Sequence, residues 1–343
     1  MSRTDQDRRR EGGYSVFVMD NHGSEIQFRC LLCGMVNAMD VTLPGCAQCG
    51  NSLVDSHGVF NLTDHVSKVE ERKFYDREYS NSEGQQPPLS LETLQPAWKR
   101  NDAAQNRLLR DAVGNLSGKA VLLIGNGASR KELTFLNHAP CRLVYTDLSA
   151  NASRIIKGEF DFAPYAETVR FAAVDAEKLP FVDESFDVVY GHAMVHHLPN
   201  VNEFLRGAYR VLKPGGRAVF MDDAYSPIWH HSKQTWLKPL MKYSHQRTGI
   251  SPEDYRFSMS GGFKESDLGP MIVSIGAVPY FQRSCLLDYL WTRAIEKLLP
   301  KSMYGPLTSG TMMDMMVGID RALSRFPQYR NNQIRLIWGF AKP

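Results

Sequence analysis

Long apolar runs are missing from this sequence of 343 residues. No stretch approaches the ~18 uncharged apolar residues that a membrane-spanning helix needs, so we predict no transmembrane segment. The first residues include arginines, but no apolar segment follows them, as a secretory signal would require. We therefore expect a cytoplasmic protein, and the length predicts one large domain or two unequal ones.

A large excess of one charge is also missing. The chain has 40 Lys and Arg against 37 Asp and Glu, a formal net charge of +3. This excess is too small to indicate that the whole chain binds nucleic acid. Hydrophobic residues make up 43% of the chain and charged residues 22%. These ordinary fractions exclude collagen-like and wholly disordered classes.

Cysteine is scarce, with six residues, yet four of them fall within twenty positions. They form two Cys-x-x-Cys pairs, each followed by a glycine, which is the spacing of a zinc knuckle. In a chain expected inside the cell, such pairs favour metal over disulfides. Four thiolates around one tetrahedral ion leave no open position, so the predicted role is structural, with four unliganded thiols as the alternative. The predicted ligands are Cys30, Cys33, Cys46 and Cys49, on a small ribbon over residues 21–62.

Local composition divides the rest of the chain. Residues 1–20 are polar, charged and without periodicity, which predicts a disordered arm. Residues 63–104 hold a charged segment and then a run rich in Ser, Gln, Gly and Pro, which is typical of a connecting segment. The main domain is expected over residues 105–343. An insertion rich in His, Trp, Tyr and Lys interrupts it at about 223–262.

Apolar runs alternate with helical patterns in the main domain. Strands buried on both faces read as continuous apolar runs, and strand–helix alternation predicts a mostly parallel sheet with helices on both faces. The expected fold class is therefore α/β, with a doubly wound sheet. The five apolar runs cover residues 119–125, 141–147, 169–175, 186–191 and 216–222.

Glycines and acids follow these predicted strands. Gly125 and Gly127 stand where the first strand turns toward its helix, the place where such sheets bind cofactors. Asp147 ends the second strand, where a carboxylate can accept both hydroxyls of a ribose, and Asp175 ends the third. The third glycine of a dinucleotide motif would fall at Arg130, which weakens that interpretation. A plain tight turn is the remaining alternative.

The run from VDAEKLPF through FDVVYGHAMVHHLP to KPGGRAVFMDD, residues 174–223, carries a specific resemblance. It resembles class I S-adenosylmethionine-dependent methyltransferases of the ubiquinone/menaquinone-methyltransferase-like branch, and the similarity extends over about residues 105–222. The resemblance implies a Rossmann-like, mostly parallel sheet of seven strands, the last antiparallel. The cysteine pattern resembles the small zinc ribbons that precede some methyltransferase domains.

The same resemblance implies which residues hold S-adenosylmethionine. The glycine turn would approach its methionine part, Asp147 its ribose hydroxyls and Asp175 its adenine. Aromatic residues of the connecting segment would cover it. The implied cofactor residues are Gly125, Asn126, Gly127, Asp147, Leu148, Asp175, Ala176, Gly191 and His192.

Two histidines are the predicted catalytic residues. His192 directly follows the fourth strand, where an imidazole could take a proton from the acceptor near neutral pH. His196 lies further along the same segment and is equally open to a structural role. Methyl transfer from a sulfonium is an in-line displacement, so positioning without a base is a further alternative.

The predicted function is methyl transfer from S-adenosylmethionine to oxygen or activated carbon of a small organic acceptor, covered by the insertion. One alternative is an RNA methyltransferase in which the zinc ribbon and the amino-terminal arginines bind the RNA. Another is a non-catalytic binding protein, because Leu123 and Ser129 stand where the family usually has an acid and a glycine. The oligomeric state is not indicated.

Overall fold

The computed structural model describes most of the predicted ribbon and main domain. The described residues are 25–43, 45–63, 68–82, 108–129, 132, 135, 140, 142–159, 167–234, 262–284, isolated positions between 286 and 307, and 310–343. The arm predicted over residues 1–20 and most of the predicted insertion lie outside them. Among the described helices, none combines the length and apolar character needed to cross a bilayer.

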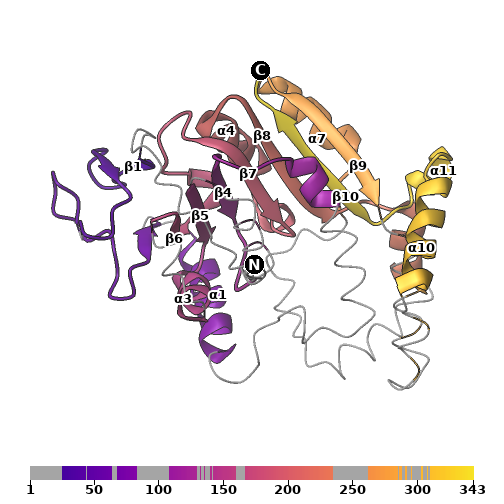
Figure 1. Cartoon of the computed structure of the whole chain (residues 1–343), viewed down its shortest axis with the longest axis horizontal. Coiled ribbons are helices and arrows are strands. Elements are labelled where there is room, and N and C mark those ends of the chain that lie inside the picture. The colour runs from indigo at the N-terminus through magenta and orange to yellow at the C-terminus, as the bar shows by residue number, and fades with distance from the viewer. Residues whose placement is uncertain are drawn as a thin grey trace, which may run out of the picture.

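One large sheet organises the described residues (Figure 1). Neighbouring strands are parallel except that β10 is antiparallel to both β8 and β9. The five apolar runs are β4 to β8, and β4 to β10 supply the seven strands implied by the resemblance. In spatial order the strands are β3 (Phe60–Leu62), β6 (Val169–Val174), β5 (Arg142–Asp147), β4 (Ala120–Ile124), β7 (Phe186–His192), β8 (Leu212–Asp223), β10 (Arg335–Ala341) and β9 (Val278–Ser284).

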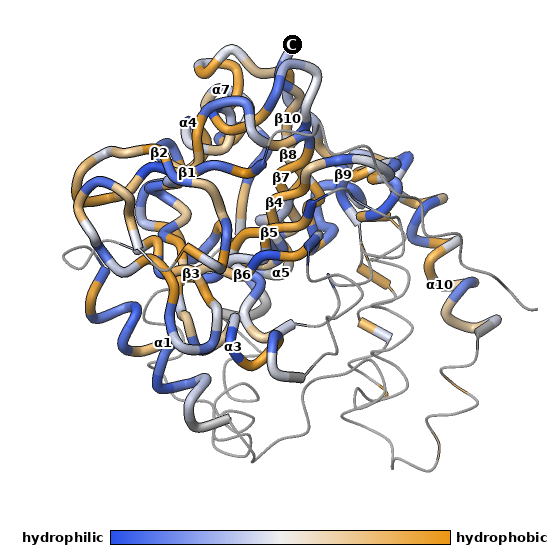
Figure 2. Tube along the Cα trace, turned by 60° about the vertical axis from the view of Figure 1, so that its left-hand side comes forward, coloured by the Kyte–Doolittle hydropathy of each residue, from blue (hydrophilic) through white to orange (hydrophobic). Residues whose placement is uncertain are grey.

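Helices cover both faces of this sheet, as expected of a doubly wound fold. Along β4, Leu122 packs in the same core cluster as Phe204 of α4, whereas Leu123 packs with Ile156 of α3. Figure 2 shows the central strands in hydrophobic colours and α1 mostly hydrophilic. The helices are α1 (Val69–Ser82), α3 (Ala150–Glu159), η3 (Ala176–Lys178), η4 (Val195–His197), α4 (Val201–Val211), α5 (Pro227–Gln234), α7 (Glu265–Ser274), α10 (Gly310–Leu323) and α11 (Pro327–Arg330).

The cysteine-rich ribbon is built onto the edge of the main sheet. Its strands β1 (Gln27–Arg29) and β2 (Val36–Ala38) form an antiparallel pair, while β3 pairs in parallel with β6. The Arg29 amide donates to the Pro180 carbonyl at 2.8 Å, and the Arg170 guanidinium donates to the Met39 carbonyl at 2.8 Å. The ribbon therefore covers an edge strand whose backbone groups would otherwise be unpaired.

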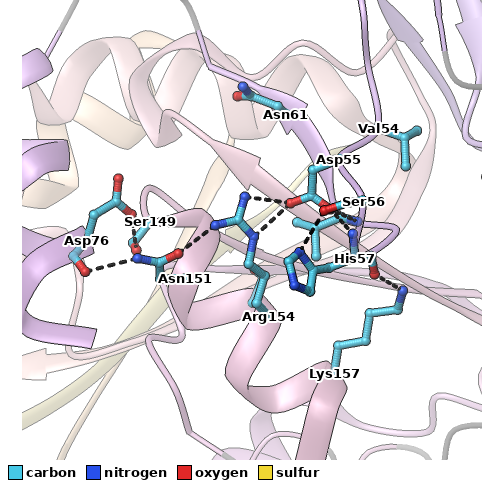
Figure 3. A network of polar contacts seen from close by, with 12 residues as sticks. Val54, Asp55, Ser56, His57, Asn61, Asp76, Ser149, Asn151, Arg154 and Lys157 are labelled. Carbon is cyan, nitrogen blue, oxygen red and sulfur yellow. Dashed lines mark hydrogen bonds and ion pairs between the residues drawn. The ribbon is translucent and has the colours of Figure 1, made fainter. Parts of the chain in front are cut away.

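A polar network ties the ribbon to α3 and α1 (Figure 3). The Asp55 carboxylate, in the turn before β3, accepts from Arg154 Nε at 2.8 Å and lies 2.7 Å from its Nη2. Arg154 also donates to Asn151 Oδ1 at 2.6 Å, and Asn151 Nδ2 donates to the Asp76 carbonyl at 3.0 Å. The Ser149 hydroxyl donates to the Asp76 carboxylate at 2.5 Å. The network thus links the ribbon to the helix that follows it.

The Asp55 carboxylate is stabilised in its ionised form. Burial opposes its ionisation, but hydrogen bonds from the Val59 and His57 amides and from Arg154 lower its pKa below the ordinary range. A lowered pKa means that the stabilisation is complete at neutral pH. It is lost only as the pH falls through that lowered pKa.

We expect Arg154→Met to lower the free energy of unfolding at pH 7 by about 1–2 kcal/mol, because it removes hydrogen bonds to a shielded carboxylate. The Arg154 and Asp55 side chains are 34% and 18% exposed. The matched control is Arg206→Met, because the Arg206 and Glu203 side chains of its pair are 66% and 51% exposed. That change should cost less than about 0.5 kcal/mol. Urea unfolding measures both, and equal losses would contradict the prediction.

Candidate functional site

The glycine turn after β4 is held in one shape by its surroundings. Gly125 and Gly127 have φ of +61° and +57°, a region that favours glycine. A Cβ on Gly125 would lie 2.8 Å from Met194 Cβ, and one on Gly127 would lie 2.4 Å from the Tyr79 hydroxyl. Beneath the turn, the Tyr145 hydroxyl donates to the Gly127 carbonyl at 3.0 Å. The backbone is therefore fixed at the carboxyl edge of the sheet.

Asn126 offers unused hydrogen-bonding groups in this turn. Its side chain is buried, and neither its amide nitrogen nor its amide oxygen has a partner among the described residues. Buried polar atoms are normally hydrogen-bonded, so such a pair needs an explanation. A polar ligand at the turn would supply the missing partners.

Asp147 connects the ends of β4 and β5. Its Oδ2 accepts from the Gly127 amide at 2.8 Å and its Oδ1 from the Ser149 amide at 2.9 Å. The pKa of Asp147 is raised to about 6, mainly by burial and also by the nearby Asp76 charge, while the hydrogen bonds from these amides oppose the shift. Leu148 follows directly. The carboxylate is thus aimed by the backbone and retains lone pairs for further donors.

Asp175 caps η3 at the end of β6. Its Oδ1 accepts from the Glu177 amide at 3.0 Å and from Lys68 Nζ at 2.9 Å, and Lys68 also pairs with Glu177 at 3.1 Å. Burial opposes the charge on Lys68, but the two acids raise its pKa above the ordinary value. Asp175 Oδ2 is buried without a partner among the described residues, beside Ala176. It is therefore available to a donor on a ligand.

Helix α1 covers the edge at which these groups meet. The Tyr79 hydroxyl lies against Gly127, and the Tyr75 hydroxyl lies 3.3 Å from His197 Nδ1. Burial and the nearby carboxylate of Asp147 raise the pKa of both tyrosines. Both therefore stay neutral near pH 7 and present aromatic surface and a hydroxyl to the site.

The two predicted catalytic histidines lie in different environments. His192 is the last residue of β7 and directly follows Gly191 in the chain. Its Nδ1 lies 3.9 Å from Glu132 Oε1. His196 lies in η4, and its Nδ1 is 2.8 Å from Asp222 Oδ1. Only the second distance is that of a hydrogen bond. The structure thus pairs His196 with a specific carboxylate.

Three functional candidates were not predicted from the sequence. Asp222 is the next-to-last residue of β8, close to the strand end as Asp147 and Asp175 are, so the same reasoning could have found it. Glu132 is buried after the glycine turn and accepts from the Ser129 hydroxyl at 2.5 Å. Neither Glu132 nor Lys68 follows a strand, so only the folded chain reveals them.

The four cysteines of the ribbon come together as predicted. Their sulfur atoms all lie within 4.8 Å of one another, with Cys30 Sγ 3.7 Å from Cys49 Sγ and Cys33 Sγ 3.6 Å from Cys46 Sγ. A tetrahedral zinc ion with Zn–S bonds of ~2.3 Å has sulfur–sulfur edges of about 3.8 Å. The cluster therefore has the size and donor chemistry of a four-thiolate zinc site.

Comparisons with known proteins match the central part of the chain to methyltransferases. Residues 122–220 match a family described as "Methyltransferase domain". The chain is 33% identical to the phthiotriol/phenolphthiotriol dimycocerosates methyltransferase of Mycobacterium leprae over 166 residues. This alignment covers 48% of this chain and 58% of the relative. It is 30% identical over 155 residues to a ubiquinone/menaquinone biosynthesis C-methyltransferase of Methylococcus capsulatus, 44% of this chain and 62% of the relative. The chain thus spans less than two thirds of either relative.

A solved structure with the same fold is phosphoethanolamine N-methyltransferase 2 of Haemonchus contortus, in complex with phosphomonomethylethanolamine and S-adenosylhomocysteine. The TM-score is 0.50 at 17% identity, over 79% of this chain and 60% of that one. At this identity the likeness concerns the fold. Residues 122–220 thus match the methyltransferase-domain family, and the described strands have the fold of class I S-adenosylmethionine-dependent methyltransferases.

Proposed function

We propose that this protein transfers a methyl group from S-adenosylmethionine to oxygen or activated carbon of a small organic acceptor. The observation that carries the proposal is the buried side-chain amide of Asn126, whose nitrogen and oxygen have no partner among the described residues. It lies in a glycine turn whose conformation leaves the backbone close to any ligand.

The residues at the sheet edge fit the three parts of this cofactor. Asp147 would accept from the ribose hydroxyls, and Asp175 Oδ2 would accept from the adenine amino group. Asn126 would hydrogen-bond the amino-acid end. Glu132, a buried carboxylate that accepts from Ser129 just after the glycine turn, would lie near that end, and Leu123 stands where the family usually has an acid. When bound, S-adenosylmethionine supplies an electrophilic methyl group on a sulfonium.

The acceptor would lie beyond the ends of β7 and β8. His192 and His196 stand there, each partly exposed, so they could contact it. The names of the relatives, a dimycocerosate methyltransferase and a quinone-biosynthesis C-methyltransferase, favour small or lipid-like organic acceptors. Bringing an acceptor atom in line with the methyl group lowers the entropic part of the barrier.

The ribbon would bind one structural zinc ion through Cys30, Cys33, Cys46 and Cys49. The four thiolates would complete its coordination, so we propose no catalytic step at the metal. Because β3 and Asp55 join the ribbon to the sheet and to α3, the ion would also stabilise the edge of the main domain.

We expect calorimetry to detect S-adenosylmethionine binding, and Asp147→Ala to weaken it by about 1.5–3 kcal/mol, since a charged acceptor of hydrogen bonds is lost. Asp183→Ala is the control, because that acid is 64% exposed and pairs with Arg210. If Asp147→Ala binds S-adenosylmethionine as tightly as the wild type does, the proposed contact between Asp147 and the ribose is refuted. If the wild-type protein does not bind S-adenosylmethionine, the proposed enzymatic activity is refuted and a non-catalytic binding role is supported.

The pKa of Asp147, raised to about 6, predicts a pH dependence of binding. If the carboxylate binds the ribose, the affinity for S-adenosylmethionine at pH 5 should be roughly tenfold below that at pH 7.5. The reason is that only about one tenth of the Asp147 side chains are ionised at pH 5. The raised pKa of Asp147 changes the stability of the fold with pH in the opposite direction to the affinity. A raised pKa stabilises the fold most below the ordinary value of ~3.9, and this contribution declines as the pH rises through about 6. A pH-independent affinity would contradict the assignment, and Asp147→Asn should abolish the dependence.

Metal analysis should find about one zinc per chain, and Cys46→Ala should lose zinc more readily and lower the thermal stability of the protein, because three thiolates bind more weakly than four. Cys285→Ala is the control, since this cysteine belongs to neither Cys-x-x-Cys pair of the sequence. A Cys46→Ala protein with full zinc content and unchanged melting would refute the site.

A further inference from the structure

We propose that His196 is the general base of this methyltransferase and that Asp222 and Trp338 position it. The inference rests on the proposed function and narrows it, because it restricts the acceptor to groups that lose a proton on methylation, an acidic O–H or C–H. The acceptor atom would form its bond to the methyl carbon as the carbon–sulfur bond breaks. Its proton would pass to His196 Nε2 and then to water, and the sulfonium would leave as a neutral thioether.

Asp222 binds one defined nitrogen of His196. The Nδ1–Oδ1 distance is 2.8 Å, and the His196 backbone amide donates to the same oxygen at 3.4 Å. The Asp222 side chain is 0% exposed. A buried carboxylate needs donors to remain ionised, so the imidazole is held in the orientation that supplies one.

Trp338 fixes the other oxygen of this carboxylate. Its indole Nε1 donates to Asp222 Oδ2 at 3.1 Å, and its ring, fully buried in β10, lies 4.8 Å from that of Phe220. Because an indole N–H can only donate, the oxygen facing it must be an acceptor. The carboxylate therefore cannot turn without breaking two hydrogen bonds.

This arrangement determines the tautomer of neutral His196. The proton sits on Nδ1, which faces the carboxylate, so Nε2 carries the lone pair. His196 Nε2 forms no hydrogen bond to any residue of the described ranges, and the side chain is 19% exposed. An acceptor molecule can therefore reach a nitrogen that is ready to take a proton.

The position of His196 suits a base near the methyl group. It follows Met194, whose side chain packs against Gly125 and Gly191 at the cofactor edge. The ring of His197 lies 4.2 Å from that of His196, and His197 Nδ1 lies 3.3 Å from the Tyr75 hydroxyl. The acid that faces His196 is Asp222, at 2.8 Å.

Asp222→Asn provides a sharp test on the full-length protein. Trp338 should hold the amide oxygen of the new side chain, so its NH₂ would face His196 Nδ1 and force the proton onto Nε2. We expect ¹⁵N NMR of histidine-labelled protein to show the Nδ1–H tautomer in the wild type and the Nε2–H tautomer in this variant. His196→Gln assigns the signal. Asp223→Asn is the matched control, since that neighbouring acid pairs with Arg335 on the exposed side and should leave the tautomer unchanged.

Kinetics test the role in proton transfer, with a phenol, a quinol and a β-dicarbonyl compound as probe acceptors. His196→Gln and Asp222→Asn should each lower kcat about 10²–10⁴-fold for the probe that reacts, with KM and S-adenosylmethionine affinity little changed. A wild-type Nε2–H tautomer, an unaltered tautomer in Asp222→Asn, or near-normal kcat in His196→Gln overturns the proposal. So does a wild-type protein that binds the cofactor but methylates none of the probes. Absence of cofactor binding would instead overturn the proposed function itself.

Discussion

Buried carboxylates at one edge of the sheet need hydrogen-bond donors, and this requirement organises the parts of the molecule around them. Asp147 takes its donors from the glycine turn, Asp175 from Lys68 before α1, and Asp222 from His196 and Trp338. A carboxylate buried without such donors would cost several kcal/mol, so each donor must hold its place. The turn, the covering helix and the last strand are thereby fixed relative to the parallel strands.

The same edge divides into two chemical halves. The ends of β4, β5 and β6 present a glycine turn with two acids, which suits a ligand with an amino-acid end, a ribose and an adenine. The ends of β7 and β8 present His192, and His196 paired with Asp222, which suits proton transfer. In the proposed reaction the methyl group would pass between the halves near Met194, which packs against Gly125 after β4 and against Gly191 in β7.

The ribbon is connected to this arrangement by strand pairing and hydrogen bonds. Its strand β3 covers β6, and Asp55 reaches α3 through Arg154, which in turn contacts α1 through Asn151. A change that loosens the ribbon would therefore reach the helix above the cofactor edge. A zinc ion bound by the ribbon would therefore influence the sheet edge through packing alone, without taking part in the chemistry.

The sequence by itself determined the strands β4 to β8, the glycine turn, Asp147 and Asp175, and the four cysteines, because unbroken apolar runs, glycines at strand ends and paired thiols are local signals. Asp222 carried the same signal and could have been predicted. Only the tertiary structure decided that β3 joins the main sheet, that Lys68 binds Asp175 and Glu132 binds Ser129, and that Asp222 binds His196. Except for the contact between Glu132 and Ser129, these join residues far apart in the chain, and they depend on strand register and helix placement, which no local pattern encodes.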